Sequence, residues 1–147
     1  MKLTLLFGRI CSGKSNYYKD SYRIVVSNIV RGIAKSSNRA ELQNTMHLDE
    51  QIATGIISAI DYSIDEHPHV VVDGIRQSSI VEKVLQYYPN AELVWLEVPV
   101  EERKRRYQNR KDRRDVESFE VADNKEIELS CQEIFSIFKE RIKIVNN

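Results

Sequence analysis

A glycine-rich segment near the start of the chain limits the folds open to it more than any other feature. Residues 8–15 read G-x-x-x-x-G-K-S and follow the apolar run 2–7, which has the length of a β-strand. Gly8 lets the chain leave this strand in a tight turn, and Gly13 lets the backbone close around an anion. The turned backbone points several N–H groups inward at the start of a helix, which makes a nest for phosphate groups. The sequence therefore predicts a phosphate-binding loop.

The last two residues of the motif indicate what the loop binds. Lys14 has the position from which an ammonium group reaches β- and γ-phosphates, and the Ser15 hydroxyl has the position of a Mg²⁺ ligand. We therefore expect a nucleoside triphosphate with Mg²⁺. The residues expected around its phosphates are Gly8, Ile10, Cys11, Ser12, Gly13, Lys14 and Ser15.

Strand-like and helix-like segments alternate along the rest of the chain. Runs of β-branched and apolar residues predict strands, and apolar positions at intervals of three and four predict helices. The expected strands are 2–7, 23–27, 69–73, 91–98 and 142–145, and the expected helices are 16–20, 48–64, 79–88, 101–115 and 126–141. This alternation predicts an α/β fold, with a five-stranded parallel sheet and helices on both faces. Residues 1–147 are expected to form a single domain.

The third expected strand ends in a carboxylate. The apolar run 70–72 leads into Asp73 and Gly74, and Arg76 follows shortly after. Ligands of open α/β sheets collect at the carboxyl ends of the strands. In proteins with a phosphate-binding loop, an aspartate at this place orders Mg²⁺, so Asp73 is the second expected metal ligand. We expect Arg76 to point into the same crevice.

Arg31 is expected one helical turn beyond the second strand. Two interpretations stay open. The Arg31 guanidinium could bind a second phosphate group, or Arg31 could be a solvated surface arginine, and the sequence favours neither.

A series of arginines follows the fourth expected strand. Segment 101–115 begins with acidic residues and continues with basic ones, which suits a helix dipole. Its arginines at intervals of three and four would line one helical face; they are Arg103, Arg106, Arg110 and either Arg113 or Arg114. This face could close over phosphates as a lid of about residues 100–125. A solvated surface helix and a basic patch for nucleic acid are the alternatives, and the phosphate-binding loop favours the lid.

Composition argues against several classes of function. The chain has 22 basic and 22 acidic residues, so no net charge directs it to nucleic acid or to a membrane. No apolar run approaches the length of a membrane span, and the N-terminal run is shorter than a signal peptide. The two cysteines, Cys11 and Cys131, lack metal-ligand spacing. We therefore expect no disulfide framework and a cytoplasmic location.

With these residues in view, the chain resembles the P-loop nucleoside monophosphate kinases, in particular the deoxynucleoside monophosphate kinase and dephospho-CoA kinase branch. The resemblance is carried by segments 8–15, 38–43 and 71–77 and by the arginines between 103 and 114. It implies a three-layer P-loop fold with an arginine-rich helical lid. It also implies phosphoryl transfer from ATP·Mg²⁺ to a small phosphorylated acceptor, of which a nucleoside or deoxynucleoside monophosphate is the first choice.

The resemblance implies roles for individual residues as well. Lys14, Asp73, Arg110 and Arg114 would be catalytic, and Arg106 and Arg110 would contact the donor nucleotide; the expected acceptor-binding residues are Arg31, Arg39, Gln43, Arg76 and Arg113. Members of the group carry a helix after the last strand that residues 1–147 do not include. A homodimer contact is therefore one expected cover for that face of the sheet, unless the chain continues.

Two other functions stay open at this point. One is a nucleotide-binding regulatory NTPase without small-molecule kinase activity. The other is a polynucleotide 5′-kinase, which would place the same arginines along a strand backbone. The balanced charge argues mildly against nucleic acid.

Overall fold

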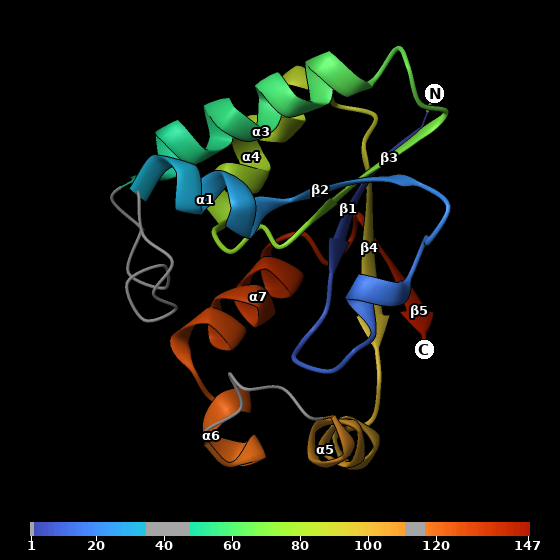
Figure 1. Cartoon of the computed structure of the whole chain (residues 1–147), viewed down its shortest axis with the longest axis vertical. Coiled ribbons are helices and arrows are strands. Elements are labelled where there is room, and N and C mark those ends of the chain that lie inside the picture. Colours follow the sequence, from blue (N-terminus) through green and yellow to red (C-terminus); the bar gives the residue numbers. More distant parts are fainter. Residues whose placement is uncertain (1, 35–47, 111–116) are drawn as a thin grey trace.

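Five parallel strands form one sheet in the order β2-β3-β1-β4-β5 (Figure 1). The computed structural model describes residues 2–34, 48–110 and 117–147. The strands are β1 (Lys2–Phe7), β2 (Tyr22–Val25), β3 (His69–Asp73), β4 (Glu92–Glu97) and β5 (Ile142–Asn146). The helices are the 3₁₀ turn η1 (Lys14–Asn16) and the α-helices α1 (Val26–Ala34), α3 (Asp49–Ser63), α4 (Ser78–Tyr87), α5 (Val100–Asn109), α6 (Phe119–Asp123) and α7 (Glu126–Ile137). The predicted α/β class with a five-stranded parallel sheet is confirmed.

Strand β1 lies at the centre of this sheet. It pairs in parallel with β3 on one side and with β4 on the other, so that Leu5 lies opposite both Val72 and Leu93. All three side chains are buried. This explains the continuous apolar runs, because a central parallel strand is covered on both faces.

One face of the sheet carries the larger core. Alternate residues of the three central strands point to it, namely Leu3, Leu5, Phe7, Val70, Val72, Leu93 and Trp95. Helices α1, α3, α4 and α7 cover this face and contribute Val30, Ile56, Ile60, Val84 and Ile134. Figure 1 shows these four helices together on one side of the strands.

The opposite face has a smaller core of a different kind. Its buried side chains are Leu6, Val71, Val94 and Leu96, and the partly buried residues packed against them are Tyr17, Tyr18 and Val145. Among the described residues, the cover of this face therefore comes from the turn after η1, while Val145 of the edge strand β5 lies beside Leu96 in the sheet. The helices that bury side chains against the sheet, α1, α3, α4 and α7, do so on the face of the larger core, as far as the described residues show.

The reason lies in the short connection between β1 and β2. Residues 8–14 are used by the glycine-rich loop, so few remain before Tyr22 begins the next strand. The helix expected at 16–20 is absent, and η1 is followed by a turn in which the Ser21 amide donates to the Tyr18 carbonyl at 3.1 Å. Two aromatic rings in edge-to-face contact, 4.5 Å apart, take the place of a helix there.

Two other boundaries differ from the expected ones. Strand β2 ends at Val25 rather than at residue 27, because α1 already begins at Val26. Helix α5 ends at Asn109, and Arg110 has the extended backbone of a helix terminus. The outer part of the expected lid helix, residues 111–116, lies outside the described residues.

No helix in the described part of the chain is both long enough and apolar enough to cross a membrane.

We expect removal of the Tyr18 ring to destabilise the protein, because this ring covers buried side chains of the sheet. Tyr18→Ala should lower the free energy of unfolding by about 2 kcal/mol or more, as truncation of packed aromatic residues does. The measurement is urea unfolding followed by the fluorescence of Trp95, the only tryptophan of the chain. Tyr62→Ala is the matched control, since the Tyr62 side chain is exposed and should contribute little. Equal losses in both variants would contradict this account of the second face.

We also expect stability to fall on mild acidification because of His69. Its two ring nitrogens hydrogen-bond with the hydroxyls of Thr4 and Ser21, at 2.8 and 2.6 Å. Burial, with a smaller contribution from Lys2, lowers the pKa of His69. The unfolded chain therefore binds the proton more readily, and stability is lost as the pH falls through the unfolded value of about 6.5. Urea unfolding at pH 7.5 and pH 5.5 should show a smaller loss for His69→Gln than for the unmodified protein.

Candidate functional site

The glycine-rich loop follows the carboxyl end of the central strand β1, and the geometry requires both of its glycines. Gly13 has φ +91°, a left-handed conformation that lets the chain turn into η1. At Gly8 the constraint is space, because an added Cβ would lie 2.3 Å from the Ser12 Oγ and 3.2 Å from the Leu96 carbonyl oxygen. The loop is therefore folded tightly against β4 and against itself.

The loop lines a pocket of about 490 Å³. Its walls are Ile10, Cys11, Ser12, Gly13, Lys14, Ser15 and Asn16 of the loop and η1, Asp73 of β3, Arg106 and Arg110 of the α5 region, and Glu128 of α7. Segments far apart in the sequence thus meet at one end of the sheet. Of the residues expected from the sequence to act together, the structure brings together the loop, Asp73, Arg106 and Arg110.

Lys14 lies folded back over the loop in this structure. Its ammonium group donates a hydrogen bond of 2.6 Å to the Gly8 carbonyl. The lysine side chain therefore lies against the loop and lines the same pocket.

Asp73 is held by an arginine that sequence reasoning missed. The Arg23 Nη1 donates to the Asp73 Oδ2 at 2.9 Å, and the same guanidinium donates to the Tyr17 carbonyl. Arg23 interrupts an otherwise apolar strand, β2, and a charge in such a strand requires a partner. That interruption was the available signal, but it does not reveal which carboxylate is the partner.

Arg106 connects α5 to the loop. It donates from Nη1 to the Cys11 carbonyl at 3.2 Å and from Nη2 to the Asn147 carbonyl at 2.9 Å. Glu102 orients it by accepting from its Nε at 3.2 Å. Hydrogen bonds from Arg105, and then from Arg106, lower the pKa of Glu102 to about 2, so this carboxylate is charged at neutral pH.

Arg110 stands at the end of α5 beside the same pocket. Its guanidinium carbon lies 5.0 Å from the centre of the Tyr107 ring, within the range of a cation–π contact. Arg106 and Arg110 thus place two positive charges on the α5 side of the pocket.

Arg103, by contrast, does not belong to a phosphate-facing row. It is 7% exposed, and it donates to both carboxylate oxygens of Asp123 in α6, at 2.6 and 3.4 Å. Arg9 of the loop contacts the same Asp123 carboxylate at 3.2 Å. Helical spacing places Arg103 near Arg106. Helix α5 packs against α6, however, so the Arg103 side chain is buried in an ion pair with Asp123.

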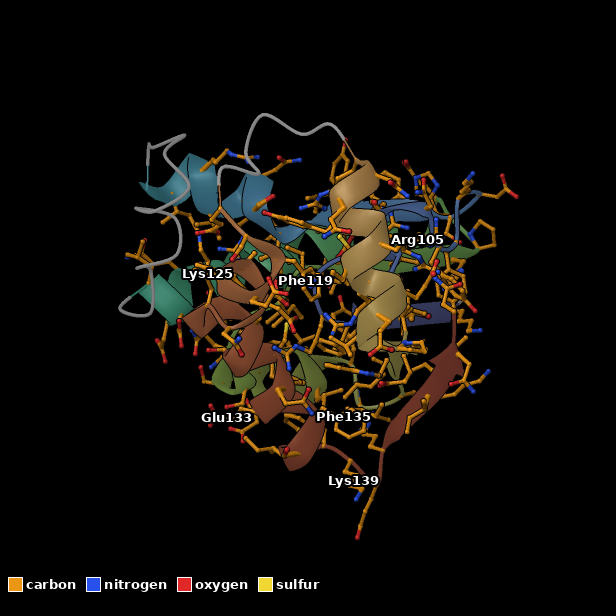
Figure 2. All side chains as sticks on the ribbon, turned by 90° about the horizontal axis from the view of Figure 1, so that it is seen from below. Arg105, Phe119, Lys125, Glu133, Phe135 and Lys139 are labelled. Carbon is orange, nitrogen blue, oxygen red and sulfur yellow. The ribbon has the colours of Figure 1, made fainter. Side chains whose placement is uncertain are left out.

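A small apolar cluster supports this ionic group. Ile10, Tyr107, Phe119 and Ala122 are its buried members. Figure 2 shows Phe119 between α6 and α5, and the Tyr107 and Phe119 rings lie 5.7 Å apart. The loop, α5 and α6 are therefore packed as one unit.

Two further residues of the site had no signal in the sequence. The Asn147 side-chain amide donates to the Ser12 carbonyl at 2.9 Å. Glu128 accepts a hydrogen bond of 2.9 Å from the Ile10 backbone amide. Burial raises the pKa of Glu128, while Lys14, the Ile10 amide and Arg9 oppose this shift.

The two expected acceptor-binding residues that the structure describes, Arg31 and Arg76, do not line this pocket. Arg31 is exposed on α1, and its Nη1 donates to Asn28 at 3.0 Å. Arg76 lines a separate small pocket between α1, α3 and α4, together with Val26 and Asp49. Arg39, Gln43, Arg113 and Arg114 lie outside the described residues.

A second pocket of about 400 Å³ lies at the opposite end of the strands. Lys2 and Glu92 are its charged residues, and its remaining walls include Tyr87, Tyr88 and Pro89. It lacks the amide-lined loop and the cluster of positive charges, so chemistry rather than volume distinguishes the candidate site.

We expect Asp123→Asn to destabilise the protein strongly, because the change leaves Arg103 buried beside a neutral partner. Loss of one member of a buried ion pair costs about 3 kcal/mol or more. Glu120→Gln is the matched control, because the Lys104–Glu120 pair of 2.7 Å is exposed and should contribute little. Urea unfolding of both variants measures the difference. Similar midpoints would show that the Arg103–Asp123 pair does not hold α6 in place.

No protein-family model and no curated protein matches the sequence. Among solved structures, the chain is similar to a shikimate kinase from Bacteroides thetaiotaomicron, with a TM-score of 0.52 and 12% sequence identity. The match covers 99% of this chain and 86% of the other. The chain therefore shares the fold of this kinase structure, in agreement with the α/β fold that the sequence predicts.

Proposed function

We propose that this protein transfers the γ-phosphoryl group of ATP·Mg²⁺ to a small acceptor. One observation carries the proposal: the phosphate-binding loop, Asp73 and two arginines of α5 line a single pocket at the carboxyl edge of the sheet. Phosphoryl transfer depends mainly on positioning and on neutralisation of charge, and these groups supply both. The similarity in fold to a shikimate kinase is consistent with such chemistry.

The residues at the loop suit a nucleotide with Mg²⁺. Ser15 and Asp73 offer a hydroxyl and a carboxylate in the same pocket, and Mg²⁺ is commonly held by one or two such oxygens together with phosphate groups. Lys14 would stabilise the transferred phosphoryl group from the loop. When bound, Mg²⁺ would neutralise charge that develops between the β- and γ-phosphates.

Arg106 and Arg110 would neutralise the donor phosphates from the α5 side. The contact of Arg106 with the Cys11 carbonyl already places its guanidinium beside the loop. We propose that Arg114 joins Arg110 in catalysis and that Arg113 contacts the acceptor, as parts of an arginine-rich lid.

For the acceptor, a nucleoside or deoxynucleoside monophosphate is our first choice. In this proposal Arg31, Arg39, Gln43 and Arg76 bind its phosphate and base. Arg76 follows shortly after Asp73, the last residue of β3, and the parallel strands β1 and β3 end at the same end of the sheet.

The location of Arg31 favours a second candidate function. A kinase for phosphorylated acceptors needs cations that converge opposite the loop, and Arg31 is exposed and bonded to Asn28. A nucleotide-binding regulatory protein that hydrolyses ATP slowly needs no such second anion site. The two functions differ in whether an acceptor stimulates ADP formation.

The test is ADP release from ATP·Mg²⁺ with a panel of acceptors: the nucleoside and deoxynucleoside monophosphates, dephospho-CoA, shikimate and a 5′-hydroxyl oligonucleotide. We expect a nucleoside monophosphate to stimulate release at least tenfold above the rate with water. Stimulation by the oligonucleotide alone would identify a polynucleotide kinase. A flat panel, with ATP still bound in calorimetry, would favour the regulatory protein.

Lys14→Ala should remove nearly all transfer, a loss of a hundredfold or more, because it removes the charge at the transferred group. Lys19→Ala is the control, since Lys19 is exposed and lies outside the pocket. Turnover retained in a folded Lys14→Ala protein would overturn the assignment of the site.

A further inference from the structure

Glu128 is an acidic side chain placed where the loop is expected to bind phosphate. Its Oε2 accepts a hydrogen bond of 2.9 Å from the Ile10 amide, and the side chain lines the same pocket as Lys14 and Ser15. The residue comes from α7, far away in sequence, so the contact is a product of the fold. An amide of the loop that would otherwise face an anion is already bonded to a carboxylate of the chain.

The charges around Glu128 are those that a phosphate group would meet. Lys14 and Arg9 from the loop attract it, and Asp123 from α6 repels it. Asp73 of β3 and the guanidinium groups of Arg106 and Arg110 line the same pocket. On its own helix, Glu128 interacts electrostatically with the Cys131 thiol.

A nucleoside triphosphate and the charged Glu128 carboxylate repel each other if both lie in this pocket. Both are anions, and both draw on Lys14 and the loop amides. Two negative charges a few ångströms apart in a partly buried site repel strongly, because little water screens them. Phosphate binding must therefore displace or neutralise the carboxylate.

Two hydrogen-bonding groups of the loop are bonded to other groups of the chain in this structure. The Ile10 amide is bonded to Glu128, and the Lys14 ammonium is bonded to the Gly8 carbonyl. Each of these two bonds involves a group that is expected to contact a nucleotide.

We propose that Glu128 is an internal competitor of the nucleotide: its carboxylate occupies the phosphate-binding loop and weakens the binding of triphosphates. This inference rests on the proposed function of the loop and adds a regulatory residue to it. The negative charge of Glu128 causes the weaker binding in this proposal. A neutral side chain of the same shape could accept the same hydrogen bond from the Ile10 amide without repelling phosphate groups.

The experiment is titration calorimetry with two probes, ATP·Mg²⁺ and inorganic tripolyphosphate. Glu128→Gln keeps the shape and a hydrogen-bond acceptor but removes the charge. We expect it to bind both probes at least tenfold more tightly than the unmodified protein. A similar gain for tripolyphosphate places the effect at the phosphates rather than at the base or sugar.

Two control variants separate charge from other effects. Glu133→Gln removes one negative charge from the exposed side of α7 (Figure 2), and its affinity should equal that of the unmodified protein. Glu128→Asp keeps the charge in the pocket and should tighten binding by no more than threefold. Circular dichroism and thermal unfolding verify that each variant is folded.

Each outcome decides the matter. Equal or weaker binding of both probes by folded Glu128→Gln, with the unmodified protein still binding ATP·Mg²⁺, overturns the inference and leaves the proposed function intact. Equal gains in Glu128→Gln and Glu133→Gln overturn it as well, because they would show only an effect of net charge. If neither the unmodified protein nor Glu128→Gln binds either probe, the proposed function falls, and the inference falls with it. Binding by Glu128→Gln alone supports both.

Discussion

The central position of β1 determines where every other part of the site lies. Because β1 pairs with β3 and β4 in parallel, the loop that follows it emerges between the ends of those two strands. Asp73, the last residue of β3, and α5, which follows β4, are thereby brought to the loop. One strand register thus positions the glycine-rich loop, a carboxylate and two guanidinium groups, although they come from distant parts of the sequence.

Ionic contacts then attach the outer elements to this centre. Asp123 lies between Arg103 and Arg9, and the three residues connect α6, α5 and the loop. Arg106 makes a second connection, to the Cys11 and Asn147 carbonyls. Because Asp123 is paired with both arginines, part of the cost of desolvating these charges is offset.

The sequence predicted the parts whose physical cause is local. Apolar periodicity identified α3, α7 and the buried strands, and the glycine spacing identified the loop. It did not predict Arg23, Glu128 or Asn147 as members of the site, because each is defined by a partner far away in the chain. Arg103 was predicted to line the same helical face as Arg106, because its spacing fits. It is instead buried, and this burial depends on the packing of α6, which no local sequence pattern reveals.

The turn after η1 gives the protein a property that a helix in its place would not. Tyr17 and Tyr18 cover the apolar second face, and they follow the loop directly, so the proposed anion-binding loop and the cover of the sheet belong to one stretch of chain. Local opening of the loop therefore exposes Leu6 and Val94 to water, at about 25 cal/mol for each Å² of apolar surface. The rates of amide hydrogen exchange in the loop and in β1 should therefore change together when conditions alter the stability of the loop.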